Sequence, residues 1–117
     1  MQNAFVYISG PITAKNGRTV EQNVFEALHV YLRLLKAGIP AFCPHLSAAF
    51  PGGWTDVDYE TWMAYDFAVI DRCTHVLMLP TWEGSAGARR ELDYANAKRI
   101  PVLFSEADLL NALKEAA

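Results

Sequence analysis

Short apolar runs of strand length alternate along the chain with longer segments in which apolar residues recur every three or four positions. The short runs predict four strands, at residues 4–9, 39–43, 75–79 and 100–104. The helical spacing covers the residues between Thr19 and Gly38, residues 56–72, residues 85–98 and the segment after Ser105. Because the first run is almost wholly apolar, we expect it to be a central strand that is buried on both faces.

Capping signals mark the ends of the predicted helices. Thr19 is followed three residues later by Gln22, which is a capping box, and Gly38 is placed to end the same helix. Ser85 and Ser105 stand where the last two helices begin. Strands that alternate with capped helices across short loops are typical of parallel βαβ units.

The alternation therefore predicts an α/β fold. Its 117 residues fit one domain, residues 1–117, and the sequence contains no repeat or linker that would divide them. We expect an open parallel sheet of about four strands, flavodoxin-like or Rossmann-like, in the order 2-1-3-4 and with helices on both faces.

Composition and charge exclude several classes of function and leave the predicted fold as it stands. The net charge is −3 and no basic tract is present, so a nucleic-acid polymer is not an expected partner. The apolar runs are too short for a membrane span, and the N-terminal residues do not resemble a secretory signal. Two cysteines are too few for a disulfide framework, so a cytoplasmic location is expected.

The ligand of an open α/β sheet sits beyond the carboxyl ends of its strands. Three loops are predicted to meet there, at residues 10–18, 44–55 and 80–85. We expect the chemistry of the protein to lie in these loops and in the helices that join them.

Two carboxylates near this edge stand out. Asp66 falls within the apolar stripe of the second helix, where a bare charge is costly, so it must be paired, hydrogen-bonded or protonated. A structural aspartate that bonds a loop is the ordinary alternative. Glu91 follows a helix start built of small residues, at positions 84–88, which lets a ligand approach free N–H groups. For Glu91 the alternative is an exposed helix glutamate, and spacing alone does not separate the two.

Aromatic residues are frequent at the same edge and could stack on a base. Tyr7, Trp54 and Trp82 are the candidates, whereas Trp62 is expected to belong to the core. No metal site is expected, because the pairs at residues 43/45 and 73/75 match no familiar ligand spacing of cysteine and histidine.

Taken together, these residues resemble the nucleoside 2-deoxyribosyltransferase-like proteins, and within them a branch of short bacterial and phage members. The resemblance runs from Tyr7 to about Phe104. It is carried by YISGPIT at residues 7–13, by Asn23 and Phe25, by an aspartate in the second helix, and by LPTWEGSAGARRE at residues 79–91. The most specific element is the spacing of Ser85, Gly87 and Glu91.

The resemblance implies a role for each matching residue. Glu91 would attack the anomeric carbon of the sugar, Tyr7 would orient it, and Asp66 would help to protonate the departing base. A nucleophilic carboxylate paired with an acid suits the cleavage of a glycosidic bond. No cofactor is implied. The residues expected to bind the substrate are Gly10, Pro11, Ile12, Trp54, Ser85, Gly87, Ala88 and Arg89.

Ser85 bears on the choice of substrate. Members that hydrolyse nucleoside 5′-monophosphates carry a serine at this position, and members that act on free nucleosides carry an aspartate. The monophosphate hydrolases also have a first-loop arginine where this chain has Thr13, although Lys15 or Arg18 could substitute.

We therefore expect an N-glycosidase of a (deoxy)nucleoside 5′-monophosphate, whose partner is that small molecule, assembled as a homodimer or larger homo-oligomer. A deoxyribosyltransferase acting on free nucleosides is the first alternative. A nucleotide-sensing module that binds without turnover is the alternative from another class.

Overall fold

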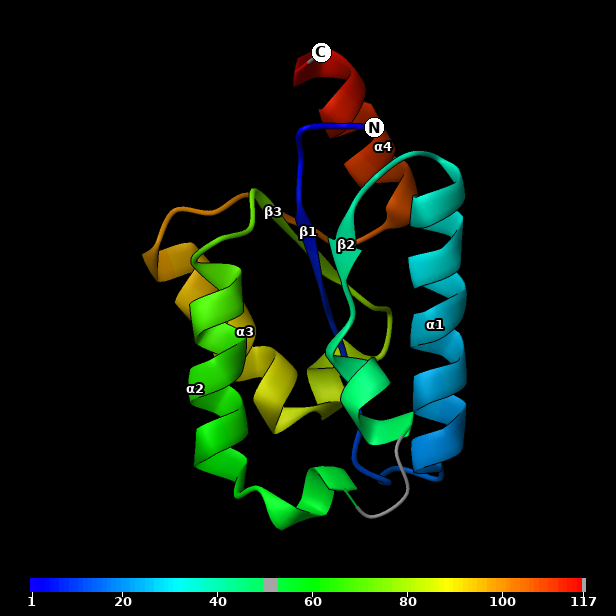
Figure 1. Cartoon of the computed structure of the whole chain (residues 1–117), viewed down its shortest axis with the longest axis vertical. Helices are drawn as coiled ribbons and strands as arrows, with labels where there is room; N and C mark the ends of the chain where they lie inside the picture. The colour runs from blue at the N-terminus through cyan, green and yellow to red at the C-terminus, as the bar shows by residue number, and fades with distance from the viewer. Residues whose placement is uncertain (50–52, 117) are drawn as a thin grey trace.

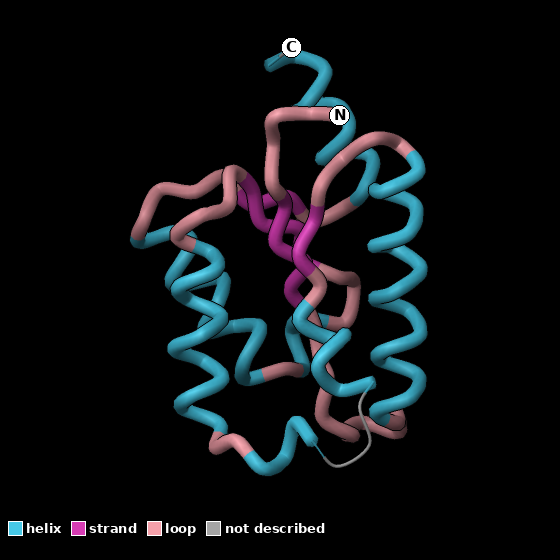
Figure 2. The backbone as a smooth tube through the Cα atoms, viewed as in Figure 1, coloured by secondary structure: helices cyan, strands magenta, loops and turns pink. Residues whose placement is uncertain are grey.

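Four parallel strands form one sheet in the order β2-β1-β3-β4, in a computed structural model that describes residues 1–49 and 53–116 (Figures 1 and 2). The strands are β1 Val6–Ser9, β2 Ala41–Phe42, β3 His75–Met78 and β4 Val102–Leu103. The parallel α/β fold and the strand order predicted from the sequence are confirmed.

The outer strands are shorter than predicted, and proline explains where they begin. Pro40 directly precedes β2 and Pro101 directly precedes β4. Proline has no N–H to donate, so it is tolerated at the edge of a sheet but not within its centre. Its carbonyl still pairs: the N–H of Val6 donates to Pro40 at 3.0 Å, and that of Val76 donates to Pro101 at 2.9 Å.

Helices cover both faces of the sheet, as predicted. One face packs against α1 and α4, and the other packs against α2 and α3 (Figure 1). The helices are α1 Val20–Lys36, α2 Tyr59–Ile70, α3 Ala86–Ala97 and α4 Glu106–Ala116. Among the helices of the described residues, none has both the length and the apolar character that a bilayer span requires.

The central strand β1 sends its side chains to the two faces in turn. Val6 and Ile8 join the core beneath α1 and α4, whereas Tyr7 joins the core beneath α2 and α3. Ser9 lies two residues after Tyr7 and therefore points to the same side. All four side chains are fully buried. A polar pair thus reaches the α2/α3 face from the middle of the sheet.

The segment between β2 and α2, whose described residues are 43–49 and 53–58, was predicted to be a loop. It contains two short 3-10 helices, η1 Pro44–Ala49 and η2 Gly53–Asp56. The N-cap of α2 is Asp58, whose carboxylate accepts the N–H of Thr61 at 2.7 Å, so the helix begins later than expected. A further 3-10 turn, η3 Trp82–Gly84, leads into α3.

Candidate functional site

A cavity of about 660 Å³ lies beyond the carboxyl ends of β1 and β3. The first and third loops, α2 and the start of α3 form most of its wall. Residues expected at the site that line it are Gly10, Pro11, Ile12, Asp66, Ser85, Gly87, Ala88 and Glu91.

Three other expected residues lie differently. Tyr7 is fully buried behind Glu91 and reaches the site only through its hydroxyl. Arg89 is exposed, is not among the described residues that line the cavity, and donates from Nη1 to the carbonyl of Glu83 at 2.6 Å. The side chain of Trp54 lies outside what the structure describes.

The carboxylate of Glu91 is buried and held at both oxygens. The Tyr7 hydroxyl donates to Oε2 at 2.7 Å, and the Ser9 hydroxyl donates to Oε1 at 2.7 Å. Glu91 is only 5% exposed, so its side chain is fixed in the wall of the cavity and is no ordinary surface glutamate. Ser9 was not predicted as a site residue, although its two-residue spacing from Tyr7 along the strand places it on the same side.

Asp66 faces the same region from α2. It is 8% exposed, and its Oδ1 is a buried oxygen without a hydrogen-bond partner among the described residues. Burial raises the pKa of Asp66 above its ordinary value, and contacts with Glu91 and Tyr7 offset part of that rise. A buried carboxyl oxygen that lacks a donor is better tolerated when the group is protonated.

The two carboxyl groups act on one another. Burial raises the pKa of Glu91 well above its ordinary value, the charge of Asp66 raises it further, and the bonds from Ser9 and Tyr7 oppose the rise. Two neighbouring carboxylates in a buried site hold on to one proton between them. Burial and the charge of Asp66 raise the pKa of Glu91 more than burial raises that of Asp66, but donors satisfy both oxygens of Glu91, whereas Oδ1 of Asp66 has none among the described residues. We assign the shared proton to Asp66 on this geometry.

The Tyr7 hydroxyl keeps its proton. Burial raises the pKa of Tyr7 well above its ordinary value, and the charges of Glu91 and Asp66 raise it further. Tyr7 is thus a permanent donor to Glu91 near neutral pH. The arrangement can present one ionised carboxylate, one protonated carboxyl and a buried hydroxyl to a molecule in the cavity.

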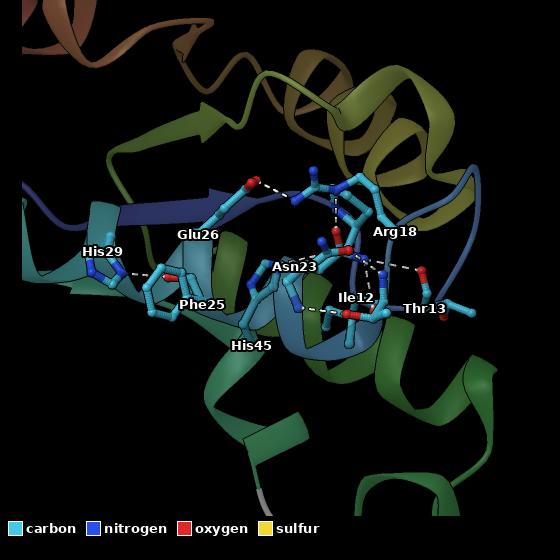
Figure 3. A network of polar contacts seen from close by, with 11 residues as sticks. Ile12, Thr13, Arg18, Asn23, Phe25, Glu26, His29 and His45 are labelled. Atoms are coloured by element: carbon cyan, nitrogen blue, oxygen red, sulfur yellow. Dashed lines mark hydrogen bonds and ion pairs between the residues drawn. The ribbon is translucent and has the colours of Figure 1, made fainter.

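Buried side chains from two sides fix the first loop (Figure 3). From α1, the Asn23 amide donates to the carbonyls of Ile12 at 3.2 Å and Thr13 at 3.3 Å. From η1, Nε2 of His45 lies 3.1 Å from the Pro11 carbonyl. Burial lowers the pKa of His45 to about 4, so the ring is neutral and Nε2 carries the proton that it donates to Pro11.

His45 also contacts a cysteine. Its second ring nitrogen, Nδ1, lies 3.7 Å from the sulfur of Cys43. In the part of the chain that the structure describes, no group of three or more histidine, cysteine or acidic side chains is placed to hold a metal ion. The role of His45 is to support the loop.

A two-residue hairpin at the tip of the first loop carries two cations at the cavity. The backbones of Lys15 and Arg18 exchange two hydrogen bonds of 3.1 Å. Asn16 and Gly17 between them have φ of 57° and 77°, as the Asn-Gly turn of a tight hairpin requires. Both cations line the cavity. The Asn-Gly pair is a hairpin signal that the sequence analysis did not use.

Contacts with α1 hold the Arg18 guanidinium. Its Nε donates to Oδ1 of Asn23 at 2.9 Å, and its Nη2 lies 2.6 Å from a carboxylate oxygen of Glu26. Asn23 therefore fixes both the backbone and the cation of the same loop. Lys15 is the more exposed of the two cations.

The start of α3 forms the opposite wall. Ser85 is its N-cap, as predicted, and Oγ accepts the N–H of Ala88 at 3.1 Å. The first N–H groups of a helix lack acceptors within it, and Ala86 and Gly87, which carry two such groups, both line the cavity. The donor group expected at Ala88 is used by the cap. An added Cβ at Gly84 would lie 2.8 Å from Nδ2 of Asn16, so the end of that exposed side chain would have to move.

Aromatic side chains of α2 complete the wall. Trp62 was expected in the core, but it is only partly buried and lines the cavity together with Tyr59 and Met63. Tyr59 is 51% exposed. The helical spacing placed these residues on one stripe, yet the start of α2 extends past the sheet, so that end of the stripe faces the cavity.

A match to a family model identifies the family of this chain. The model of the family described as "Domain of unknown function (DUF4406)" matches residues 4–104. The chain belongs to this family. The matched span of the DUF4406 domain includes all four strands and the residues of the cavity described above. A comparison with curated proteins found no match.

Proposed function

We propose that the protein is an N-glycosidase that cleaves the bond between base and sugar in a (deoxy)nucleoside 5′-monophosphate. The observation that carries the proposal is the environment of Glu91, a buried carboxylate held by two hydroxyl donors beside the partnerless Oδ1 of Asp66. The resemblance to the nucleoside 2-deoxyribosyltransferase-like proteins supports the same roles for these residues.

The reaction begins with attack by a Glu91 carboxylate oxygen on the anomeric carbon of the sugar. The bond from that carbon to the base nitrogen breaks, and its electron pair stays on the nitrogen. Asp66 gives its proton to the departing base, which leaves in neutral form. A carboxyl group whose pKa is raised by burial is suited to this step because it keeps its proton to a higher pH than an exposed aspartate does.

Water completes the turnover. It attacks the anomeric carbon of the glycosyl ester, Asp66 takes up the proton, and Glu91 leaves as a carboxylate. Tyr7 and Ser9 hold Glu91 throughout. No step needs a cofactor, and none is proposed.

The preference for a 5′-phosphate rests on the two walls of the cavity that carry positive charge or free donors. Lys15 and Arg18 line it from the hairpin, and the first turn of α3 supplies N–H groups at the positive end of a helix. Arg18 shares its charge with Glu26, so Lys15 is the cation that remains for a phosphate. Tyr59 and Trp62 offer surfaces on which a base can stack.

A substrate panel tests this proposal. The protein is incubated with nucleosides and with their 5′-monophosphates, and free base is measured by chromatography, while binding of each compound is followed by calorimetry. Release of base from the monophosphates supports it. Base exchange on free deoxynucleosides alone would replace it with a deoxyribosyltransferase, and binding without any release of base would replace it with a sensing module.

The setting of this activity is also a proposal. The low number of cysteines supports a cytoplasmic location. The resemblance supports a homodimer or a larger homo-oligomer.

A further inference from the structure

We propose that Ser9 is a positioning residue for Glu91, as Tyr7 is. Each hydroxyl holds one oxygen of the carboxylate, so two donors from one strand fix both oxygens. The effect on turnover rests on the proposed glycosidase function, whereas the effect on Glu91 itself does not. Nothing in the resemblance assigns a role to Ser9.

The geometry leaves Ser9 no other use. Its hydroxyl donates to Oε1 of Glu91 at 2.7 Å across 82 positions of sequence, and its side chain is fully buried. Tyr7 makes the matching bond to Oε2 at 2.7 Å. Because residues two apart in a strand point to the same side, β1 presents the two donors as a rigid pair.

A charged acceptor makes these bonds strong. A hydroxyl that donates to a carboxylate stabilises its ionised form, and the loss of such a bond leaves a buried charge without a partner. Burial and Asp66 both push Glu91 toward the protonated form, and Ser9 and Tyr7 oppose them. Without Ser9, Oε1 loses the donor that keeps it ionised and in place.

Other charged and titratable groups around Glu91 also affect its pKa, so a test of the role of Ser9 must leave them unchanged. Tyr7 on β1 and Asp66 on α2 act on it directly. Among the described residues, the remaining charged side chains that line the cavity are Lys15 and Arg18 of the first loop and Glu83 of η3. On α3 itself, Arg90 is engaged by Glu60 of α2 at 2.8 Å.

The experiment follows the carboxyl carbon of Glu91 by NMR through a pH titration, in wild type and in Ser9→Ala. The signal is assigned by its disappearance in Glu91→Gln. Alanine nearly fits the buried site of serine, so the variant should fold. We expect the pKa of Glu91 to rise by about one unit or more, as for the loss of a hydrogen bond to a charge. Ser9→Cys keeps the size with a weaker donor and should fall between the two.

Activity provides the second readout. In Ser9→Ala, base release near neutral pH should fall by roughly tenfold to a hundredfold, with the acidic limb of the pH profile displaced upward. Ser105→Ala is the matched control, because it removes the capping hydroxyl of α4, outside the cavity lining, and should leave the titration of Glu91 unchanged.

An unchanged titration of Glu91 in Ser9→Ala would overturn the inference. If wild type releases no base at all, the glycosidase proposal fails, but the NMR titration still decides the role of Ser9. The two failures are therefore distinguishable.

Discussion

The hydroxyl of Tyr7 donates a 2.7 Å hydrogen bond to Oε2 of Glu91, although 84 positions separate the two residues in sequence. The parallel topology brings them together, because β1 lies at the centre of the sheet and α3 packs on the face to which Tyr7 points. The bond makes Glu91 a fixed part of the cavity wall, and the predictions below follow from that position.

Replacement of Asp66 by asparagine should slow base release by about 10²–10⁴-fold, because the amide keeps the volume of the side chain and cannot supply the proton. Initial rates on a nucleoside monophosphate measure the loss, with exposed Asp93→Asn on α3 as the control. A substrate whose leaving group needs no proton, such as a nitrophenyl deoxyriboside, should recover most of the rate. Equal slowing on both substrates would remove Asp66 from the role of acid.

Replacement of Ser85 by aspartate should reverse the preference for a phosphate. Aspartate is also a good N-cap, so α3 is kept, but its charge repels a phosphate at the same place. The ratio of rates on a deoxynucleoside monophosphate and its free nucleoside should fall by about tenfold or more. Ser105→Asp adds the same charge at the cap of α4 and should leave the ratio alone. An equal ratio in wild type and Ser85→Asp would contradict the phosphate site.

Replacement of Asn23 by alanine should loosen the first loop. The variant loses bonds to Ile12, Thr13 and Arg18, and it leaves buried groups unpaired, which should cost about 1–3 kcal/mol in the free energy of unfolding. Denaturant titration measures this loss, and KM for the monophosphate should rise. The neighbouring Gln22→Ala loses only an exposed capping bond and should leave KM unchanged. A wild-type KM in Asn23→Ala would mean that the loop does not need this support.

Stability should depend on pH through Glu91. Its pKa in the folded protein is raised above the ordinary 4.5, so the stability it contributes is present below that value and is lost as pH rises through the folded pKa. Glu91→Gln cannot ionise. The free energy of unfolding of the variant, relative to wild type, should therefore increase from about pH 4.5 upward. His45, whose pKa is about 4, makes both proteins lose stability in acid. Because this loss is the same in both, it does not contribute to the difference between their free energies of unfolding.

Denaturant titrations of both proteins at several pH values measure that difference. A difference that does not change with pH would mean that Glu91 ionises in the folded protein as it does in the unfolded chain.

The sheet was predictable because its strands are apolar runs separated by helices with clear caps at Thr19 and Ser85. The start of β2 and the start of α2 were harder to predict. Pro40 and the cap at Asp58 determine these two positions locally, and the spacing of apolar residues contains no sign of either. Short 3-10 helices such as Pro44–Ala49 are too short to produce a periodic pattern of apolar residues that could be recognised in the sequence.

Asp66 stood out in the sequence because a carboxylate on an apolar stripe is unusual, whereas Glu91 was distinguished from an ordinary helix glutamate only by the family resemblance. The loop-supporting roles of Asn23 and His45 were not predicted, because each side chain bonds a backbone carbonyl of the first loop, and a carbonyl is present at every position whatever the sequence. The roles of such residues become visible only in the contacts of the folded structure.

The most direct test of the account is the rate of base release from a deoxynucleoside 5′-monophosphate by Glu91→Gln beside wild type. Glutamine keeps the helix and the size of the side chain but removes the nucleophile, so the rate should fall by several orders of magnitude. Exposed Glu115→Gln on α4 should retain the wild-type rate. A rate near that of wild type in Glu91→Gln would contradict the proposed role of this carboxylate.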